Sequence, residues 1–204
     1  YAKVHVLDRA ANSRLDRCAV EIAHGEVQVV EKVVGYKKIR FHTHENVGFG
    51  EVRLPDLELH TTSFWLTLEE SMLRMLEGEG LSRVLAVEAL RGLGRALATV
   101  AAVALMCDRR DLAVVLEDDL LAESGADGGA PFAPTLHVYD GYPGGIGLAP
   151  RVFERHLELL TSARRLIAAC PCEAGCPSCV GPASTSVMAW GGGSVITRRA
   201  AAIR

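Results

Sequence analysis

Four of the six cysteines in this 204-residue chain lie within one ten-residue stretch. Their spacing is C-x-C-x3-C-x2-C, formed by Cys170, Cys172, Cys176 and Cys179. Two residues between cysteines let both thiolates turn toward one ion, and Pro171, Gly175 and Pro177 supply tight turns. Because structural Zn²⁺ takes four such ligands in a closed tetrahedron, the pattern favours one zinc ion. A closed site has no open position for a substrate, so the predicted role is structural.

Other states of the same four cysteines stay open at this point. They could be free thiols, they could pair as two disulfides, or they could hold an iron–sulfur cluster, although the familiar cluster spacings differ from this one. Cys18 and Cys107 are isolated in a predicted strand and a predicted helix, and we expect both to be core residues.

A second group of residues could contact nucleic acid. Lys37, Lys38 and Arg40 place three positive charges beside Tyr36 and Phe41. The pattern is typical of a solvated strand face, and it is equally that of an edge where cations follow phosphates and an aromatic ring stacks on a base. We take these three cations as candidate nucleic-acid-binding residues.

Two further patterns are weaker. His42 and His44 would share one face of a strand and His60 could approach them, but a His-x-His pair is a poor indicator of a metal site. The glycine-rich turn 140–147 could offer backbone N–H groups to an anion. Pro143 removes one of those donors and no lysine follows, so we favour a closely packed turn.

The charge balance limits the classes of function. The net charge is −3 and the pI is about 6.2, which argues against a surface built throughout to neutralise phosphate. The charge is uneven, because residues 111–140 carry seven acids and no base, whereas residues 141–204 carry seven arginines and three acids. No Gly-Lys-Ser/Thr tripeptide occurs, so the chain lacks the phosphate-binding loop of a nucleotide motor and is predicted to be non-catalytic by itself.

The elements that must position these residues indicate an α+β fold. An N-terminal antiparallel β region is predicted at 1–62, and a mostly helical part with the four-cysteine knuckle at 63–204. Gly48-Phe-Gly50 and Leu54-Pro55-Asp56 are expected to end the extended region, and the helical period starts at Thr62. The other predicted elements are strands at Val4–Leu7, Cys18–Ile22, Glu26–Phe41, Leu112–Leu116 and Thr135–Tyr139, one long helix or a broken pair over Leu81–Met106, and a helix over Arg151–Ala169.

The chain has no recognisable targeting segment. No basic leader precedes an apolar run and a cleavage site, and the longest apolar stretch, Ala96–Cys107, is shorter than the about 20 residues that span a bilayer. We therefore expect a cytoplasmic protein without membrane contact. Since the chain begins with Tyr1, we expect it to be a piece of a longer protein.

Several motifs together resemble a known family. The chain is similar to the C-terminal zinc-binding accessory domain of superfamily 2 DNA helicases of the mitomycin-repair type, which are relatives of fungal RecQ-like helicases. The resemblance covers about residues 30–182. It rests on Val34-Gly-Tyr-Lys-Lys38, His42-Thr-His-Glu-Asn46, Glu58-Leu-His-Thr-Thr62 with Trp65, Met106-Cys-Asp-Arg-Arg-Asp111, Tyr139-Asp-Gly-Tyr-Pro-Gly-Gly-Ile-Gly-Leu148 and the block Cys170 to Pro182.

The resemblance implies a domain attached to a motor of two RecA-type lobes. Such a parent enzyme translocates 3′-5′ on single-stranded DNA with ATP and Mg²⁺, in DNA repair, and its metal-binding cysteines correspond to the four named above. This domain would assist DNA engagement or couple DNA to the motor lobes. The alternative is a zinc-stapled protein–protein interaction module in a repair or phage-defence complex. The tail after Pro182 departs from the polar continuation that the family suggests.

Overall fold

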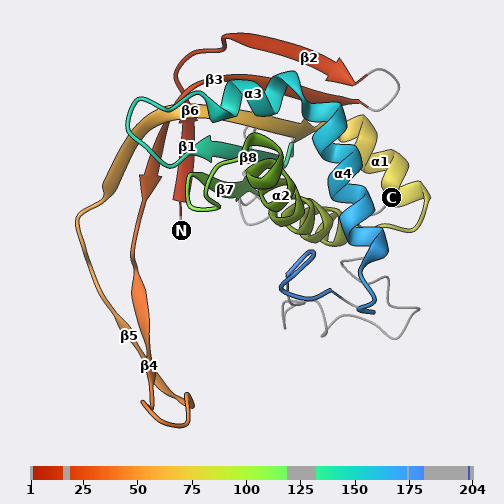
Figure 1. Cartoon of the computed structure of the whole chain (residues 1–204). Coiled ribbons are helices and arrows are strands. Elements are labelled where there is room, and N and C mark those ends of the chain that lie inside the picture. Colours follow the sequence, from red (N-terminus) through yellow and green to blue (C-terminus); the bar gives the residue numbers. More distant parts are fainter. Residues whose placement is uncertain (1, 16–18, 119–131, 174, 182–201, 203–204) are drawn as a thin grey trace, which may run out of the picture.

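A curved antiparallel sheet with helices against one face forms the body of the molecule, and a two-stranded hairpin projects from it (Figure 1). The computed structural model describes residues 2–15, 19–118, 132–173, 175–181 and 202. This arrangement confirms the predicted α+β fold with its N-terminal antiparallel sheet. The strands are β1 Ala2–Val6, β2 Ala11–Leu15, β3 Val20–Glu31, β4 Gly35–Ile39, β5 Asn46–Glu51, β6 Leu57–Leu68, β7 Leu112–Glu117 and β8 Thr135–Asp140, and the helices are α1 Glu70–Gly78, α2 Arg83–Leu105, α3 Leu148–Glu154 and α4 His156–Ala169.

The sheet is built on its two longest strands, β3 and β6, which pair along 12 residues each. The strand order is β1-β3-β6-β8-β7, and β2 pairs with β3 off this path. The sheet curls so far that its first and last strands approach each other. There the backbone N–H of Val4 in β1 donates a hydrogen bond of 2.7 Å to the Glu117 side chain at the end of β7.

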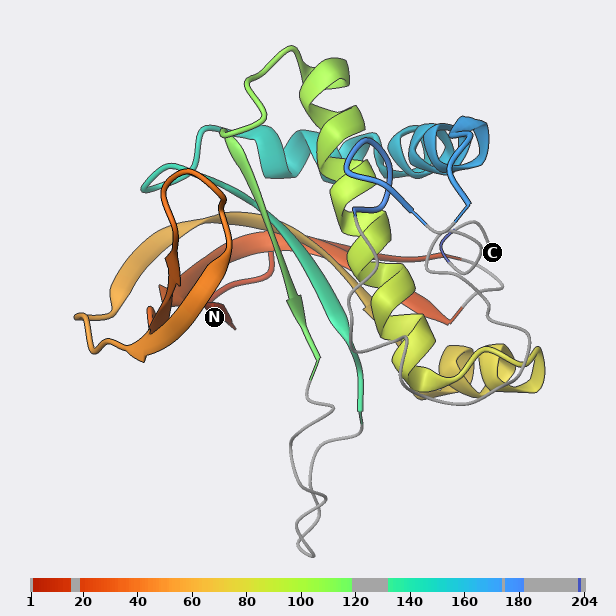
Figure 2. The ribbon, with the colours of Figure 1, turned by 90° about the horizontal axis from the view of Figure 1, so that it is seen from below.

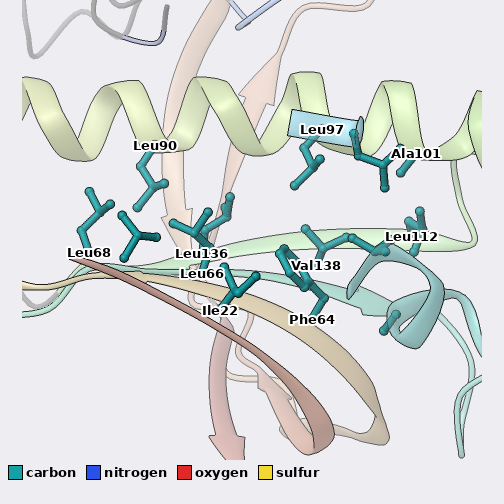
Figure 3. Packing of buried hydrophobic residues seen from close by; sticks show 14 of the residues in the cluster. Ile22, Phe64, Leu66, Leu68, Leu90, Leu97, Ala101, Leu112, Leu136 and Val138 are labelled. Atoms are coloured by element: carbon teal, nitrogen blue, oxygen red, sulfur yellow. The ribbon is translucent and has the colours of Figure 1, made fainter. Parts of the chain in front are cut away.

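Helix α2 lies across the sheet and forms the main core with it (Figure 3). Leu90 and Leu97 of α2 face Leu136 and Val138 of β8 in this core. Gly94 allows the close approach, because a Cβ atom there would lie 2.6 Å from Leu136 Cδ1. The segment predicted as one long helix or a broken pair is therefore a single helix, and Gly94 brings it against the sheet.

The helix predicted to begin at Thr62 is wrong, because β6 continues to Leu68 and α1 begins only at Glu70. This end of β6 is buried on both faces, with Phe64 in the core under α2 and Trp65 in a second core on the opposite face. A strand buried on both faces has a continuous apolar sequence, and such a run cannot be told from a helix by its period.

Two other predicted boundaries are also corrected. Gly48-Phe-Gly50 does not end the extended region, because these residues lie inside β5. The helix predicted over Arg151–Ala169 is divided at Arg155 into α3 and α4. Arg155 has φ −105° and ψ 17°, and its guanidinium donates to the carbonyl of Ala104 at 2.9 Å, which joins the break to the end of α2.

Some predictions fall outside what the structure tests. Cys18, most of the acidic segment after β7 and the tail after Gly181, apart from Ala202, lie outside the described residues. The division at residue 62 stays a prediction, although β6 runs through that position. No helix within the described ranges is long and apolar enough to cross a membrane.

Candidate metal centre and nucleic-acid interface

The four clustered cysteines bring their sulfur atoms to one point. Cys170 Sγ lies 3.5 Å from the Sγ atoms of Cys172 and Cys176, and Cys179 Sγ lies 3.5 Å from Cys172 Sγ and 3.6 Å from Cys176 Sγ. All four sulfurs lie within 4.8 Å of one another. A tetrahedral ion with bonds of about 2.3 Å separates its sulfur ligands by about 3.8 Å, so the group fits one such ion.

A tight turn between the last two cysteines shapes this centre. The N–H groups of Cys179 and Gly181 both donate to the carbonyl of Cys176, at 3.1 and 2.9 Å. The N–H of Cys176 donates to Cys179 Sγ at 3.3 Å, a contact that favours the thiolate. Gly181 has φ +83°, and a Cβ atom there would lie 2.9 Å from Cδ of Arg95, so glycine lets the turn close against α2.

The centre rests on the two longest helices (Figure 2). Cys170 directly follows α4. Cys179 and Val180 are buried in a small core with Ala96 of α2 and Ile167 of α4. An ion held here would therefore fix the end of α4 and the segment behind it to the side of α2.

The thiols differ in their tendency to ionise. The backbone N–H of Ser178 lowers the pKa of the Cys176 thiol to about 7. Burial and the neighbouring thiols raise the pKa of Cys172 to about 12. Four sulfurs this close cannot all ionise without a cation, because like charges at this distance repel each other.

The candidate nucleic-acid residues lie on the projecting β4–β5 hairpin (Figure 1). The structure does not place the three cations on one face. Lys37 and Lys38 are successive strand residues and point to opposite faces. Arg40 lies in the connecting turn and pairs with Glu45 at 3.4 Å.

Each lysine of the hairpin has an aromatic neighbour. Lys38 Nζ lies 5.9 Å from the ring centre of Tyr36, and Lys37 Nζ lies 5.9 Å from that of Phe49. Sequence reasoning missed Phe49, because it treated the flanking glycines as the end of a strand. The alternation Val47-Gly-Phe-Gly50 was the available signal. Phe41, at the tip, is 86% exposed and confirms an aromatic side chain open to a partner there.

Comparison with known proteins finds a family model that matches the segment carrying the cysteines. Residues 93–180 match the MrfA Zn-binding domain family. The chain is 36% identical over 166 residues to the ATP-dependent helicase YprA of Bacillus subtilis (strain 168), a match that covers 81% of this chain and 20% of that protein. The chain is therefore homologous to a small part of a large helicase, as its motifs predicted.

Solved structures of MrfA, a DUF1998 helicase, match the chain along most of its length. The crystal structure of MrfA bound to DNA matches with a TM-score of 0.65 and 33% identity over 89% of this chain. A second MrfA structure matches with a TM-score of 0.53 and 32% identity over 87% of the chain. The chain spans about a fifth of the length of each of these relatives.

The histidines that the sequence singled out do not come together as a second metal centre. His42 and His44 lie in the hairpin turn, whereas His60 lies on β6. In the part of the chain that the structure describes, the four cysteines form the only group of three or more possible metal ligands.

The glycine-rich turn 140–147 before α3 binds a carboxylate of the protein's own chain, that of Asp140. The fully buried carboxylate of Asp140 accepts from the N–H groups of Ile146 at 2.7 Å, Leu148 at 3.1 Å and Ala149 at 2.8 Å. Thr62 also donates to it, at 3.2 Å. The predicted close packing holds only at Gly141 and Gly145, where a Cβ atom would lie 3.0 Å from the carbonyl oxygen of Arg110 and would collide with Thr62 Oγ1, respectively, whereas Gly144 and Gly147 have open space around them. The internal anion was missed, since the sequence signal was only an acid before a glycine turn.

Proposed function

We propose that the chain is the zinc-binding accessory domain of an MrfA-like, ATP-dependent DNA helicase. Cys170, Cys172, Cys176 and Cys179 would hold one Zn²⁺ as four thiolates. The single observation that carries the proposal is the convergence of these four sulfur atoms within a segment of the MrfA Zn-binding domain family. The ion has no open coordination position, so it stabilises the α2–α4 end of the domain and takes no part in a reaction.

The motor of the parent enzyme would lie elsewhere in the longer chain. The relatives are about four times as long as this chain, and YprA is named as an ATP-dependent helicase. ATP, Mg²⁺ and 3′-5′ translocation on single-stranded DNA therefore belong to the parent's RecA-type lobes. This domain would engage DNA or couple it to those lobes during DNA repair.

The hairpin supplies the proposed DNA contact. Lys37, Lys38 and Arg40 would bind phosphates of a single strand, in keeping with an MrfA structure that contains DNA. No carboxylate pairs with Lys37 or Lys38 within the described residues. The Arg40–Glu45 pair is exposed, so it costs little to exchange the carboxylate for a phosphate.

A protein–protein module remains the second candidate. Ile39 is 61% exposed and Val47 is 55% exposed on the same hairpin. Exposed apolar side chains on a projecting ribbon are also typical of a surface that docks on protein. A hairpin that binds no DNA but binds another protein of a repair or phage-defence complex would favour this function.

The metal proposal is tested by elemental analysis of protein prepared without added zinc. We expect about one zinc ion per chain. Cys179→Ala should lose most of the metal and lower the unfolding midpoint, because Cys179 is also buried against α2. Cys107→Ala is the matched control, since that free thiol lies outside the cluster and should leave the zinc content unchanged. Iron with visible absorption, or no metal, would overturn the zinc assignment.

The DNA contact is tested by binding to a labelled single strand over a salt series. Each phosphate-binding lysine contributes about 0.7 to the slope of log affinity against log salt on a single strand. The double variant Lys37→Ala/Lys38→Ala should make that slope less steep. The control variant Lys3→Ala, on β1, should leave the slope unchanged. Absence of binding by the unaltered chain at low salt would refute a direct DNA contact.

A further inference from the structure

On one face of the β4–β5 hairpin, the aromatic ring of Tyr36 covers the backbone of Gly50. Tyr36 is opposite Gly50 in the strand register, and Lys38 is opposite Gly48. A Cβ atom added at Gly50 would collide with the Tyr36 ring, so the ring covers the position where a side chain would stand. Tyr36 nevertheless remains 49% exposed. The ring therefore has one side on the backbone and an open side toward solvent.

A lysine lies beside the open ring. The Lys38 ammonium is 5.9 Å from the Tyr36 ring centre, which is near the outer limit of a cation–π contact. This lysine is held loosely, and its long stem can reach an anion next to the ring. An aromatic face with an adjacent cation matches one nucleotide, because the base stacks on the ring and the phosphate meets the ammonium.

We propose that Tyr36 is a base-stacking residue for single-stranded DNA and that Lys38 binds the phosphate next to the stacked base. The proposal rests on the proposed DNA-binding function. It adds a contact to the bases, whereas that function names only contacts to the phosphates. Stacking is indifferent to base identity, since every base has a π-face. The domain would accordingly bind single-stranded DNA without preference for its base sequence.

The opposite face of the hairpin is less suited to this role. It carries Lys37 opposite Phe49 and Gly35 opposite Glu51, so a carboxylate lies next to the aromatic side chain on that face. A carboxylate repels phosphate. On the Tyr36 face, by contrast, both positions opposite the side chains are glycine, so no carboxylate lies opposite Tyr36 or Lys38. The charge favours a nucleic acid over an apolar protein surface.

The experiment compares two strands that differ only in their bases. The 204-residue chain is titrated onto a labelled deoxythymidine strand of about 15 nucleotides and onto an abasic strand of the same length. Tyr36→Ala should weaken binding to the thymidine strand about 5- to 100-fold, as expected for one lost stacking contact, and should leave the abasic strand within about 2-fold. Tyr36→Phe should keep the affinity, because it retains the ring.

Matched variants separate stacking from folding and from charge. Gly50→Ala keeps Tyr36 but displaces its ring, so it should weaken thymidine binding in the same direction. Phe49→Ala, on the opposite face, should have the smaller effect. Lys38→Ala should weaken both strands. The substitutions at Tyr36, Lys38 and Phe49, which are exposed, should not move the unfolding midpoint of the domain.

The outcomes distinguish this proposal from the function on which it rests. If Tyr36→Ala binds the thymidine strand as tightly as the unaltered chain, or if Phe49→Ala costs more, the stacking role is overturned while DNA binding stands. Equal losses on the two strands would also overturn it. If the unaltered chain binds neither strand, the proposed DNA contact itself fails.

Discussion

The glycine turn before α3 and the β4–β5 hairpin use similar residues in opposite ways. Both are rich in glycine and both carry groups that could bind a partner. In the turn, the three N–H groups directed at one anion are all used by the buried carboxylate of Asp140. In the hairpin, Tyr36, Phe49 and Phe41 remain half to almost fully exposed. A motif whose polar groups are satisfied within the chain is structural, and one whose groups stay open is a candidate for binding.

The largest test of this contrast is removal of the internal anion. Asp140→Ala leaves the buried N–H donors of Leu148 and Ala149 and the partly buried one of Ile146 without an acceptor, at about 1–3 kcal/mol for each buried unsatisfied group. We expect the free energy of unfolding, measured in urea, to fall by at least about 2 kcal/mol.

The control for Asp140 comes from the hairpin. Glu45→Ala removes an exposed carboxylate that pairs with Arg40 and should cost no more than about 0.5 kcal/mol. Similar losses for the two variants would mean that the turn and the hairpin do not differ as described.

A smaller effect is expected where glycine serves packing in the body. Gly94→Ala places a Cβ atom 2.6 Å from Leu136 Cδ1 and 2.9 Å from Val114 Cγ1. Overpacking costs about 1–3 kcal/mol, and the higher helix propensity of alanine returns about 1 kcal/mol, so the variant should lose about 1 kcal/mol. Gly78→Ala, with open space around it, should be neutral or stabilising. A stabilising Gly94→Ala would contradict the close packing of α2.

The smallest effect concerns pH. Burial works to raise the pKa of Glu117, but hydrogen bonds from His137 and from the N–H of Val4 lower it below its usual 4.5. The stabilisation is therefore present above about pH 4.5 and is lost as the pH falls through the lowered pKa. Glu117→Gln should cost about 1 kcal/mol or less near pH 7, and this difference should shrink below about pH 4. A difference that grows in acid would reverse the sign and refute the role of Glu117.

Local patterns were the predictable part of this molecule. The cysteine spacing and the two apolar strands 112–116 and 135–139 depend on residues near one another in the chain, and the structure agrees with both. The contact between Tyr36 and Gly50 was not predictable, because it depends on the register of two strands. The same holds for Asp140, whose partner Thr62 lies 78 residues away. The end of β6 was misread because burial on both faces removes the alternation that marks a strand.

The approach of β1 to β7 has a consequence for how the protein is made. The hydrogen bond between Val4 and Glu117 joins residues that are 113 positions apart. The β6 edge of the β3–β6 pair is also unpaired until β8 has been synthesised. A chain still emerging from the ribosome therefore presents Trp65 and its apolar neighbours before the strands that bury them exist. We expect this domain to fold after synthesis has passed β8, and to depend until then on whatever shields an unfinished sheet from aggregation.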